Sequence, residues 1–525
     1  MRTFLCLALL AAAVPGCGGS GGGGGTGGGG GTAAAYPNDA SPLGTNLTAV
    51  DYWTPELVFV DVFKHASTWI PQLTSGTSPW NTGAAFAGTT ADGYPLLNSG
   101  QAACAILCWA IDNHYPGGTY VCLYDGAGTL EFRGAASIAS QTPGRIEVNV
   151  NPLLGGIIVR ILATSPSDPV RNIRLIMPGY EQSYATQVFT PEFLARWDRF
   201  KVLRFMDWAK TNSSTQTNWS DRATPTWYTQ AGPRGVAPEY MVDLCNRLNA
   251  DAWVCLPHLA TDAYVRELAR VLRDGLNPGL KVCIEHSNEV WNGIFPQASY
   301  AQTQGLALGL STNAYEAQLR YHSQRSVQIF GLFEQEFGGL SRLVRVLAAQ
   351  AANPWTGTTI MNWQIAYASA DALAIAPYFG GYLGAESTQA SVAAMSVSEV
   401  HAACLSDITT AMGWVSSHVA NANARGLETI CYEAGQHLVG VGTAQSNATL
   451  TNLFVAANRD AGMKPLLRAY LDAWRGSGGT LMVQFSSMFR YGQYGSWGAL
   501  EWHDQATSPK YEALTEFIEA NPRWW

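Results

Sequence analysis

Charged side chains are scarce in this sequence, and no stretch of it is rich in lysine or arginine. Only 13% of the 525 residues are Asp, Glu, Lys or Arg, and the formal net charge is -8. A chain with this balance lacks the basic footprint that attracts a phosphate backbone or an anionic membrane surface. We therefore expect no nucleic acid partner, and a neutral substrate fits the composition better.

Several catalytic and cofactor signatures are also missing. The sequence has no phosphate-binding loop, no dinucleotide fingerprint and no serine nucleophile elbow. It has no Cys-x-x-Cys pair, and its histidines, His286, His437 and His503 among them, show no paired metal-ligand spacing. Metal-dependent hydrolysis is therefore the least favoured barrel chemistry, and we expect neither a metal nor another cofactor.

The N-terminus has the layout of an export signal rather than of a membrane-spanning helix. Arg2 precedes an apolar stretch over residues 4–14, and small residues follow it. Residues 14–17, Val-Pro-Gly-Cys, resemble a bacterial lipobox, in which Cys17 becomes the lipidated first residue of the mature protein. We expect residues 1–17 to be a lipoprotein-type signal peptide; cleavage near residues 11–13 without lipidation is the alternative.

A glycine-rich linker is expected next, over residues 18–40. A flexible spacer after an acylated cysteine would hold an enzyme clear of its membrane. The prediction is an exported lipoprotein at the outer membrane or cell surface, with a secreted or periplasmic protein as the alternative. Export permits disulfides among the eight cysteines beyond residue 17, but their spacing indicates no connectivity.

From about residue 198 onward, short apolar strands alternate with long helical stretches, as in βα units around a parallel sheet. The strand candidates are residues 201–206, 252–256, 282–286, 343–348, 372–376, 428–432 and 480–485. An eighth is expected near residues 44–47, followed by an apolar-periodic helix over residues 56–69. Eight strands close a barrel, so the predicted fold class is α/β, a (β/α)8 TIM barrel. Its first βα unit would span residues 41–75 and the remainder residues 186–525.

Residues 76–185, between the first and second barrel strands, have a different texture. Residues 145–150 alternate with period two, residues 155–162 are rich in β-branched side chains, and glycine turns separate such runs. We expect an inserted, sandwich-like all-β small domain. It would either bind carbohydrate or brace the barrel, and the sequence favours neither role.

Two glutamates follow predicted strands at the ends where a parallel barrel collects its reactive side chains. Glu289 follows the strand over residues 282–286, in Ser-Asn-Glu-Val-Trp-Asn, and Glu433 ends the strand over residues 428–432, in Tyr-Glu-Ala-Gly-Gln-His. We expect their carboxyl groups to face one another across the barrel mouth. Glu285 shares strand parity with Glu289 but lies about 13 Å deeper, so we interpret it as structural.

An Asn-Glu pair ending strand four and a Glu ending strand seven resemble the clan A glycoside hydrolases, which include cellulases, mannanases and β-glycosidases. The resemblance implies a retaining mechanism with Glu289 as general acid/base and Glu433 as nucleophile, their carboxyl groups about 5–5.5 Å apart. It also implies that Asn288 hydrogen-bonds the sugar 2-hydroxyl. The Ser-Asn-Glu-Val-Trp-Asn string, together with a β insertion, further resembles bacterial proteins labelled cellulase-like or cellulose-binding.

Two further positions match the clan pattern. Arg204, near the end of strand two, resembles the arginine that hydrogen-bonds the nucleophile; a structural ion pair, for instance with Glu285, is the alternative. Tyr378, after strand six, resembles the tyrosine that also bonds the nucleophile. The histidine usually found two residues before that tyrosine is Ala376 here, which indicates a divergent branch.

Aromatic residues in the predicted loops are candidates for sugar binding. Trp497, beyond strand eight, resembles the clan's tryptophan platform under the sugar at the cleaved bond. Trp208 and Trp291 would form further subsites or simply pack in the core, and the same choice applies to Trp219 and Trp227. His258, after strand three, would either contact sugar or be satisfied by backbone.

The sequence therefore predicts a retaining, endo-acting glycoside hydrolase that cleaves a β-linked polysaccharide. A β-glucan is favoured, while mannan, xylan and bacterial exopolysaccharide stay open. The alternative is a non-catalytic, surface glycan-binding lipoprotein, which has no physical need for a proton donor opposite a nucleophile. The expected partners are a polysaccharide or oligosaccharide substrate and, through the anchor, a membrane, and we expect a monomer.

Overall fold

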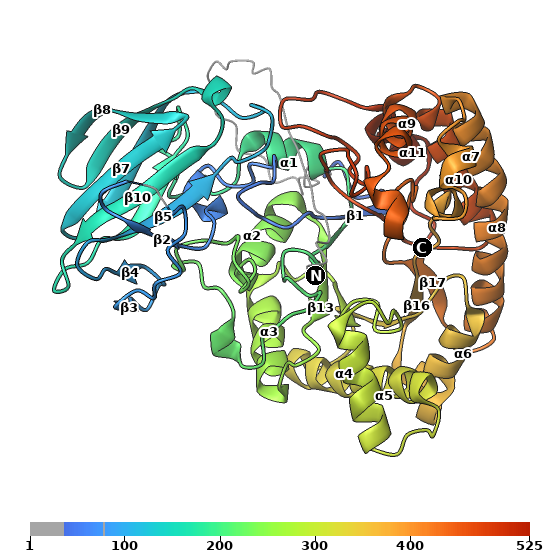
Figure 1. Ribbon diagram of the computed structural model, residues 1–525. Helices are drawn as coiled ribbons and strands as arrows, with labels where there is room; N and C mark the ends of the chain where they lie inside the picture. The colour runs from blue at the N-terminus through green and yellow to red at the C-terminus, as the bar shows by residue number, and fades with distance from the viewer. Residues whose placement is uncertain (1–35, 77–78) are drawn as a thin grey trace, which may run out of the picture.

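A closed barrel of eight parallel strands forms the main body of the computed structural model, which describes residues 36–76 and 79–525 (Figure 1). β1 pairs with both β12 and β18, which closes the barrel and confirms the predicted fold class. In order around the barrel, the strands are β1 (Leu43–Asn46), β12 (Val202–Arg204), β13 (Asp251–Leu256), β14 (Val282–His286), β15 (Leu343–Ala348), β16 (Ala372–Ile375), β17 (Glu428–Cys431) and β18 (Met482–Gln484).

The predicted signal peptide, its Cys17 and residues 18–35 of the predicted linker lie outside the described residues. None of the helices formed by the described residues combines the length and the hydropathy that a bilayer crossing needs. The eight cysteines of the described chain are all buried and carry free thiols.

Helices surround the barrel on the outside and present apolar stripes to it. In α3 the buried residues recur every three to four positions, from Tyr264 to Leu272, while Thr261 caps its N-terminus. The helices are α1 (Pro191–Trp197), α2 (Pro238–Leu248), α3 (Asp262–Gly275), α4 (Pro296–Ala307), α5 (Ala314–Phe337), α6 (Pro354–Asn362), α7 (Gln389–Val392), α8 (Val397–Asn423), α9 (Ala448–Arg459), α10 (Met463–Gly476) and α11 (Pro509–Ala520).

Strand alternation separates the barrel interior from the layer under the helices. In β14, Val282 and Ile284 belong to the core shared with the helices, whereas Cys283 belongs to the cluster inside the barrel. Because side chains in a strand point alternately to opposite faces, Glu285 shares the inner face with Cys283. Side chains therefore fill the barrel interior, and in this fold reactive groups are expected at the mouth, where the carboxyl ends of the strands lie.

The insertion folds as two four-stranded antiparallel sheets beside the barrel (Figure 1). Both sheets contribute to one buried apolar cluster, with Tyr120 and Ile146 from one sheet and Phe132 and Val159 from the other. The first sheet has the strand order β2 (Ile70–Leu73), β5 (Gln101–Leu107), β10 (Ile157–Thr164) and β7 (Gly128–Gly134). The second has the order β11 (Arg171–Ile176), β6 (Gly118–Asp125), β9 (Arg145–Val150) and β8 (Ala136–Thr142). A separate pair is formed by β3 (Gly88–Thr89) and β4 (Pro95–Leu96).

The helix expected over residues 56–69 is wrong. The segment forms isolated β-bridges at Phe59 and Asp61 and a short 3-10 turn, η1 (Val62–His65), and β2 then begins at Ile70 within the insertion. Its apolar residues serve two cores, because Phe59 packs in the barrel cluster and Val62 in the insertion cluster. A segment buried from two sides shows apolar spacing without needing a helix. The first barrel strand is therefore followed by the insertion, and the first α-helix, α1, comes only after it.

Candidate active site

Glu289 and Glu433 line one cavity of about 390 Å3 at the mouth of the barrel. The cavity collects side chains that follow six of the eight barrel strands, as expected for the carboxyl ends of a parallel barrel. These include Met206 and Asn212 after β12, Asn288 after β14, Gln350 after β15, Tyr378 after β16, His437 after β17, and Phe485 and Trp497 after β18.

Glu433 lies directly after β17 with both of its carboxylate oxygens occupied. Arg204 donates from Nη1 to Oε1 at 2.8 Å, and the Tyr378 hydroxyl donates to Oε2 at 3.0 Å. Burial raises the pKa of Glu433, and the Arg204 charge and the two hydrogen bonds oppose that rise. Donors on both oxygens and an adjacent cation favour the ionised carboxylate.

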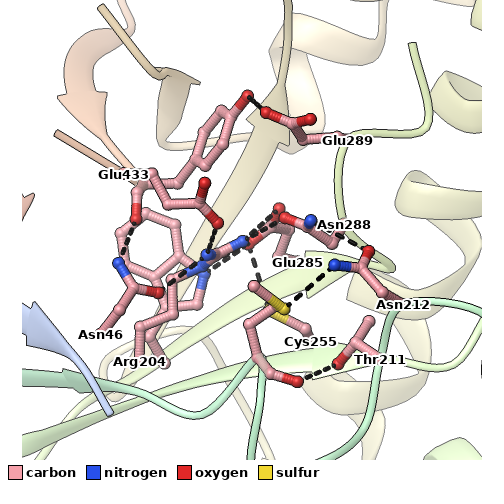
Figure 2. Close-up of polar contacts among 12 residues, drawn as sticks. Asn46, Arg204, Thr211, Asn212, Cys255, Glu285, Asn288, Glu289 and Glu433 are labelled. Carbon is pink, nitrogen blue, oxygen red and sulfur yellow. Dashed lines mark hydrogen bonds and ion pairs between the residues drawn. The ribbon is translucent and has the colours of Figure 1, made fainter. Parts of the chain in front are cut away.

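Arg204 also contacts Glu285. It therefore bonds the predicted nucleophile and forms a structural ion pair at the same time. Figure 2 shows its guanidinium between the two carboxylates. Its Nε and Nη2 donate to Glu285 Oε2 at 3.0 and 2.9 Å, Nη2 also donates to Glu285 Oε1 at 3.1 Å, and further bonds go to Asn46 and Asn288. Arg204 and Glu285 are fully buried. Because Glu285 also accepts a bond from Trp253 Nε1 at 2.8 Å, it is a structural anchor below the mouth.

Glu289 has a different set of partners, all of them neutral. Tyr432 donates from its hydroxyl to Oε1 at 3.1 Å, and Asn292 donates from Nδ2 to Oε2 at 2.8 Å. Burial, and then the charge of Glu433, raise the pKa of Glu289 to about 7, against the effect of these two donors. Near neutral pH, a large share of Glu289 therefore carries a proton, while the cation and hydroxyl at Glu433 favour its ionised form.

The backbone after β14 is in the left-handed region at two residues. Ser287 has φ of 60° and Glu289 has φ of 43°. Non-glycine residues adopt this conformation at an energetic cost, and such residues cluster at active sites. Asn288, between them, accepts a bond from Arg204 at 2.8 Å and donates to Asn212 at 3.1 Å, so the turn is tied to β12.

Trp497 stands in the cavity among other aromatic rings. Its ring contacts Tyr378, Phe485 and His437 with centroids 5.9, 5.8 and 5.0 Å away, all edge-to-face. Its Nε1 donates to the Tyr494 carbonyl at 2.9 Å. The indole is thus held by its edge and by its neighbours, which leaves a ring face as its contribution to the cavity. Trp291 also lines the cavity, and its Nε1 donates to the Tyr432 hydroxyl at 3.2 Å.

Two predicted sugar-binding residues are away from the cavity. Trp208 is fully buried and packs against Phe193 and Phe205, with centroids 6.3 and 5.3 Å away, so it is a core residue between α1 and β12. His258 is 7% exposed and packs edge-on against Tyr300 at 5.2 Å, outside the cavity lining. Both assignments were wrong because a position on a loop does not indicate which way its side chain points.

Sequence reasoning missed Tyr432 and Asn292, the two partners of Glu289. Strand alternation places Tyr432 on the inner face with Ile430, because Cys431 between them packs in the core shared with the helices; the departure from alternation comes at Glu433, beyond the end of β17. Tyr432 is buried in the barrel interior and its hydroxyl reaches up to the mouth. Asn292 could have been predicted as a partner of Glu289, because it lies three residues after it in the same motif.

The cavity lining contains no lysine or arginine among the described residues. Burial lowers the pKa of His437, so its imidazole is neutral near pH 7. Nowhere in the described part of the chain do three or more His, Cys, Asp or Glu side chains come together as a metal site would need. The two glutamates are therefore the charged groups of the lining.

No family model and no curated protein matches the chain. Solved structures with a similar fold include a GH51 arabinofuranosidase from Xanthomonas axonopodis pv. citri, with a TM-score of 0.41 and 10% identity over 64% of this chain and 67% of that one. A modular endo-β-1,4-mannanase from Cellulomonas fimi has a TM-score of 0.32 and 11% identity over 60% and 62% of the two chains. A GH5-4 endoglucanase from an uncultured bacterium has a TM-score of 0.34 and 10% identity over 61% and 81%.

This chain spans about two thirds of the length of the arabinofuranosidase and slightly less of the mannanase. The likeness to these enzymes concerns the fold, and the chemistry proposed below depends on this chain's own residues. The barrel itself is shown by this chain's own strand pairing, in which β1 pairs with both β12 and β18.

Proposed function

We propose that the chain is a retaining glycoside hydrolase, with Glu433 as nucleophile and Glu289 as general acid/base. The observation that carries this proposal is that two carboxyl groups line one cavity and have different partners, one set favouring the ionised form and the other the protonated form. Arg204 and Tyr378 hold Glu433 ready as an anion, while burial and the neighbouring negative charge keep a proton on Glu289. A retaining glycosidase needs this pairing of an anionic nucleophile with a proton donor.

In the first step, Glu433 attacks the anomeric carbon while Glu289 protonates the leaving oxygen. The covalent glycosyl ester that forms has no charge on Glu433. Because that charge is one of the causes that raise the pKa of Glu289, its loss makes Glu289 more acidic. Glu289 is then suited to remain ionised and to take a proton from the water that hydrolyses the intermediate.

The substrate is proposed to be an uncharged β-linked polysaccharide cleaved internally, with β-glucan favoured. The cavity offers no cation that would pair with a uronate or sulfate group, because its lining lacks lysine and arginine and Arg204 is fully engaged. Trp497 and Trp291 supply aromatic surface that suits the C–H face of a pyranose. Asn288 lines the same cavity, which supports a role in binding a sugar hydroxyl.

We propose that the protein is exported and anchored through a lipid on Cys17, and acts as a monomer. Asn38, near the start of the described chain, donates to the carbonyls of Phe200 and Leu248, which precede β12 and β13. The chain therefore enters the barrel at the end opposite the mouth. An anchor attached upstream would therefore be joined to the barrel at the end opposite its mouth.

The test is reducing-sugar release by the purified mature protein and its Glu433→Ala variant on β-glucans, mannans, xylans and bacterial exopolysaccharides. We expect the parent to cleave at least one neutral polymer and the variant to lose several orders of magnitude in rate. Glu519→Ala, at an exposed surface glutamate, is the matched control and should keep full activity. Binding of one polymer without cleavage by either protein would contradict hydrolysis and favour the glycan-binding alternative.

A further inference from the structure

A second cavity, of about 410 Å3, adjoins the catalytic one. It lies between the start of α9 with the turn before it and the loop over residues 489–494 that follows β18. Gln445 and Tyr494 line both cavities. The two cavities therefore lie next to each other and share a wall.

The second cavity presents the groups that neutral sugars bind. Gln445, Asn452 and Gln493 line it and are exposed, and their side-chain amides form no hydrogen bond within the described chain. Amides both donate and accept, so unpaired ones suit the hydroxyl groups of a sugar. Tyr494 in this lining is 42% exposed, which adds aromatic surface for the apolar face of a pyranose.

The one cation of this lining is already engaged. Arg490 forms an ion pair with Asp112 at 2.9 Å and donates to the Ala110 carbonyl at 3.1 Å. Both partners belong to the β insertion, in the segment between β5 and β6. A few residues away, the His114 ring stacks on Trp502 with centroids 4.2 Å apart. The insertion thus braces the loop after β18, and a charged ligand finds no free cation in the second cavity.

The wall between the two cavities is attached to the tryptophan of the catalytic site. The Tyr494 carbonyl accepts the hydrogen bond of Trp497 Nε1 at 2.9 Å. The backbone of Tyr494, which lines both cavities, is therefore tied to the Trp497 indole of the first. A chain of sugars leaving the catalytic cavity on this side would meet Tyr494 next.

We propose that the second cavity is a distal binding site for neutral sugar units of the same polysaccharide chain, with Asn452, Gln493 and Tyr494 as its specific contacts. This inference rests on the proposed function and deepens it, because a distal site favours binding of long substrates and cleavage within the chain. A long chain gains contacts that a short one cannot reach, so the distal site raises kcat/KM only above a minimum substrate length.

The test compares the parent with an Asn452→Ala/Gln493→Ala double variant on cello- and manno-oligosaccharides of increasing length. These side chains have no hydrogen-bond partner in the described chain, so the fold should be unaffected. We expect kcat/KM for the longest oligosaccharides to fall about tenfold, equivalent to one or two lost hydrogen bonds, with no change for the shortest one cleaved. Equal kcat/KM for parent and variant at every length would overturn the proposal.

The matched control is Gln141→Ala/Asn423→Ala, which removes two exposed amides on β8 and α8, away from both cavities. It should leave every kcat/KM unchanged. Calorimetric binding of the same oligosaccharides to Glu433→Gln, with and without the distal double substitution, separates this proposal from hydrolysis. Length-dependent loss of binding without any turnover by the parent would support the distal site and refute the hydrolase, whereas no binding at any length would refute the distal site.

Discussion

The ends of β14 and β17 carry the same side chain in one cavity, yet they prepare it for opposite tasks. At the end of β17, Glu433 receives a cationic donor and a hydroxyl. At the end of β14, Glu289 receives an amide and a hydroxyl, with no cation in contact. The residue type is the same in the two regions, and the partner sets favour ionisation of Glu433 over that of Glu289. Substitutions at either strand end test this difference.

Substitution Arg204→Gln should have the largest effect, because it removes the cation that distinguishes the two regions. It leaves Glu285 and Glu433 buried without their charge partner, and breaking such a pair costs about 3–5 kcal/mol of unfolding free energy. Glu433 should also hold a proton to higher pH, which moves the acid limb of the pH–rate profile upward.

Urea unfolding and the pH profile measure these two effects for Arg204→Gln. Arg160→Gln is a control of the same kind, a fully buried arginine of the β insertion paired with Glu131. It should lose stability without moving the acid limb. An unchanged acid limb in Arg204→Gln would mean that the cation does not govern the ionisation of Glu433.

Substitution Glu289→Gln removes the proton donor and leaves the nucleophile. We expect the rate on polysaccharide to fall by about 10²–10⁴-fold, the usual contribution of general acid catalysis. An aryl glycoside with a good leaving group needs no protonation, so the rate of its first step should fall far less. The alkaline limb near pH 7, set by the pKa of Glu289, should disappear. Equal losses on both substrates would refute Glu289 as the acid.

We also expect the stabilities of the parent and of Glu289→Gln to depend differently on pH. The pKa of Glu289 rises from 4.5 to about 7 on folding, so between these values the folded state binds more protons than the unfolded state. The free energy of unfolding should therefore fall as pH rises through this window, by up to about 3 kcal/mol from this group. Urea unfolding at the two ends of the window should show this loss in the parent and its absence in Glu289→Gln.

Substitution Tyr432→Phe should have the smallest effect, and it tests a single neutral donor to Glu289. The hydroxyl donates to Glu289 Oε1 and so favours the ionised form. Without it, the pKa of Glu289 should rise further, and the alkaline limb should move upward by less than about one pH unit, in keeping with one hydrogen bond. Tyr120→Phe, a buried tyrosine of the β insertion that bonds the Pro116 carbonyl, is the control. A downward shift of the limb would contradict this role.

Much of the barrel could be predicted because parallel strands buried on both faces appear as continuous apolar runs. All seven runs after residue 198 correspond to strands, and the eighth lies near residues 44–47 as expected. The segment over residues 56–69 could not be predicted in the same way. Its apolar residues face two different cores, and apolar spacing does not reveal what a side chain packs against.

For the site, motif order placed Glu289 and Glu433 at the ends of strands four and seven, and the structure brings both into one cavity with Arg204 and Tyr378. Trp208 could not be separated from Trp497 in this way. Both follow barrel strands, but one side chain turns into the helical layer and the other into the mouth. That difference is set by local backbone direction and by the neighbouring elements.

The sequence by itself determined the barrel, its βα order and the two strand ends that carry carboxyl groups, because periodicity and strand position are local properties of the chain. Only the tertiary structure decided which glutamate has a cation and which has neutral donors. Arg204, Tyr378, Tyr432 and Asn292 come from four different strand ends, and electrostatic coupling depends on distances across the barrel rather than along the chain.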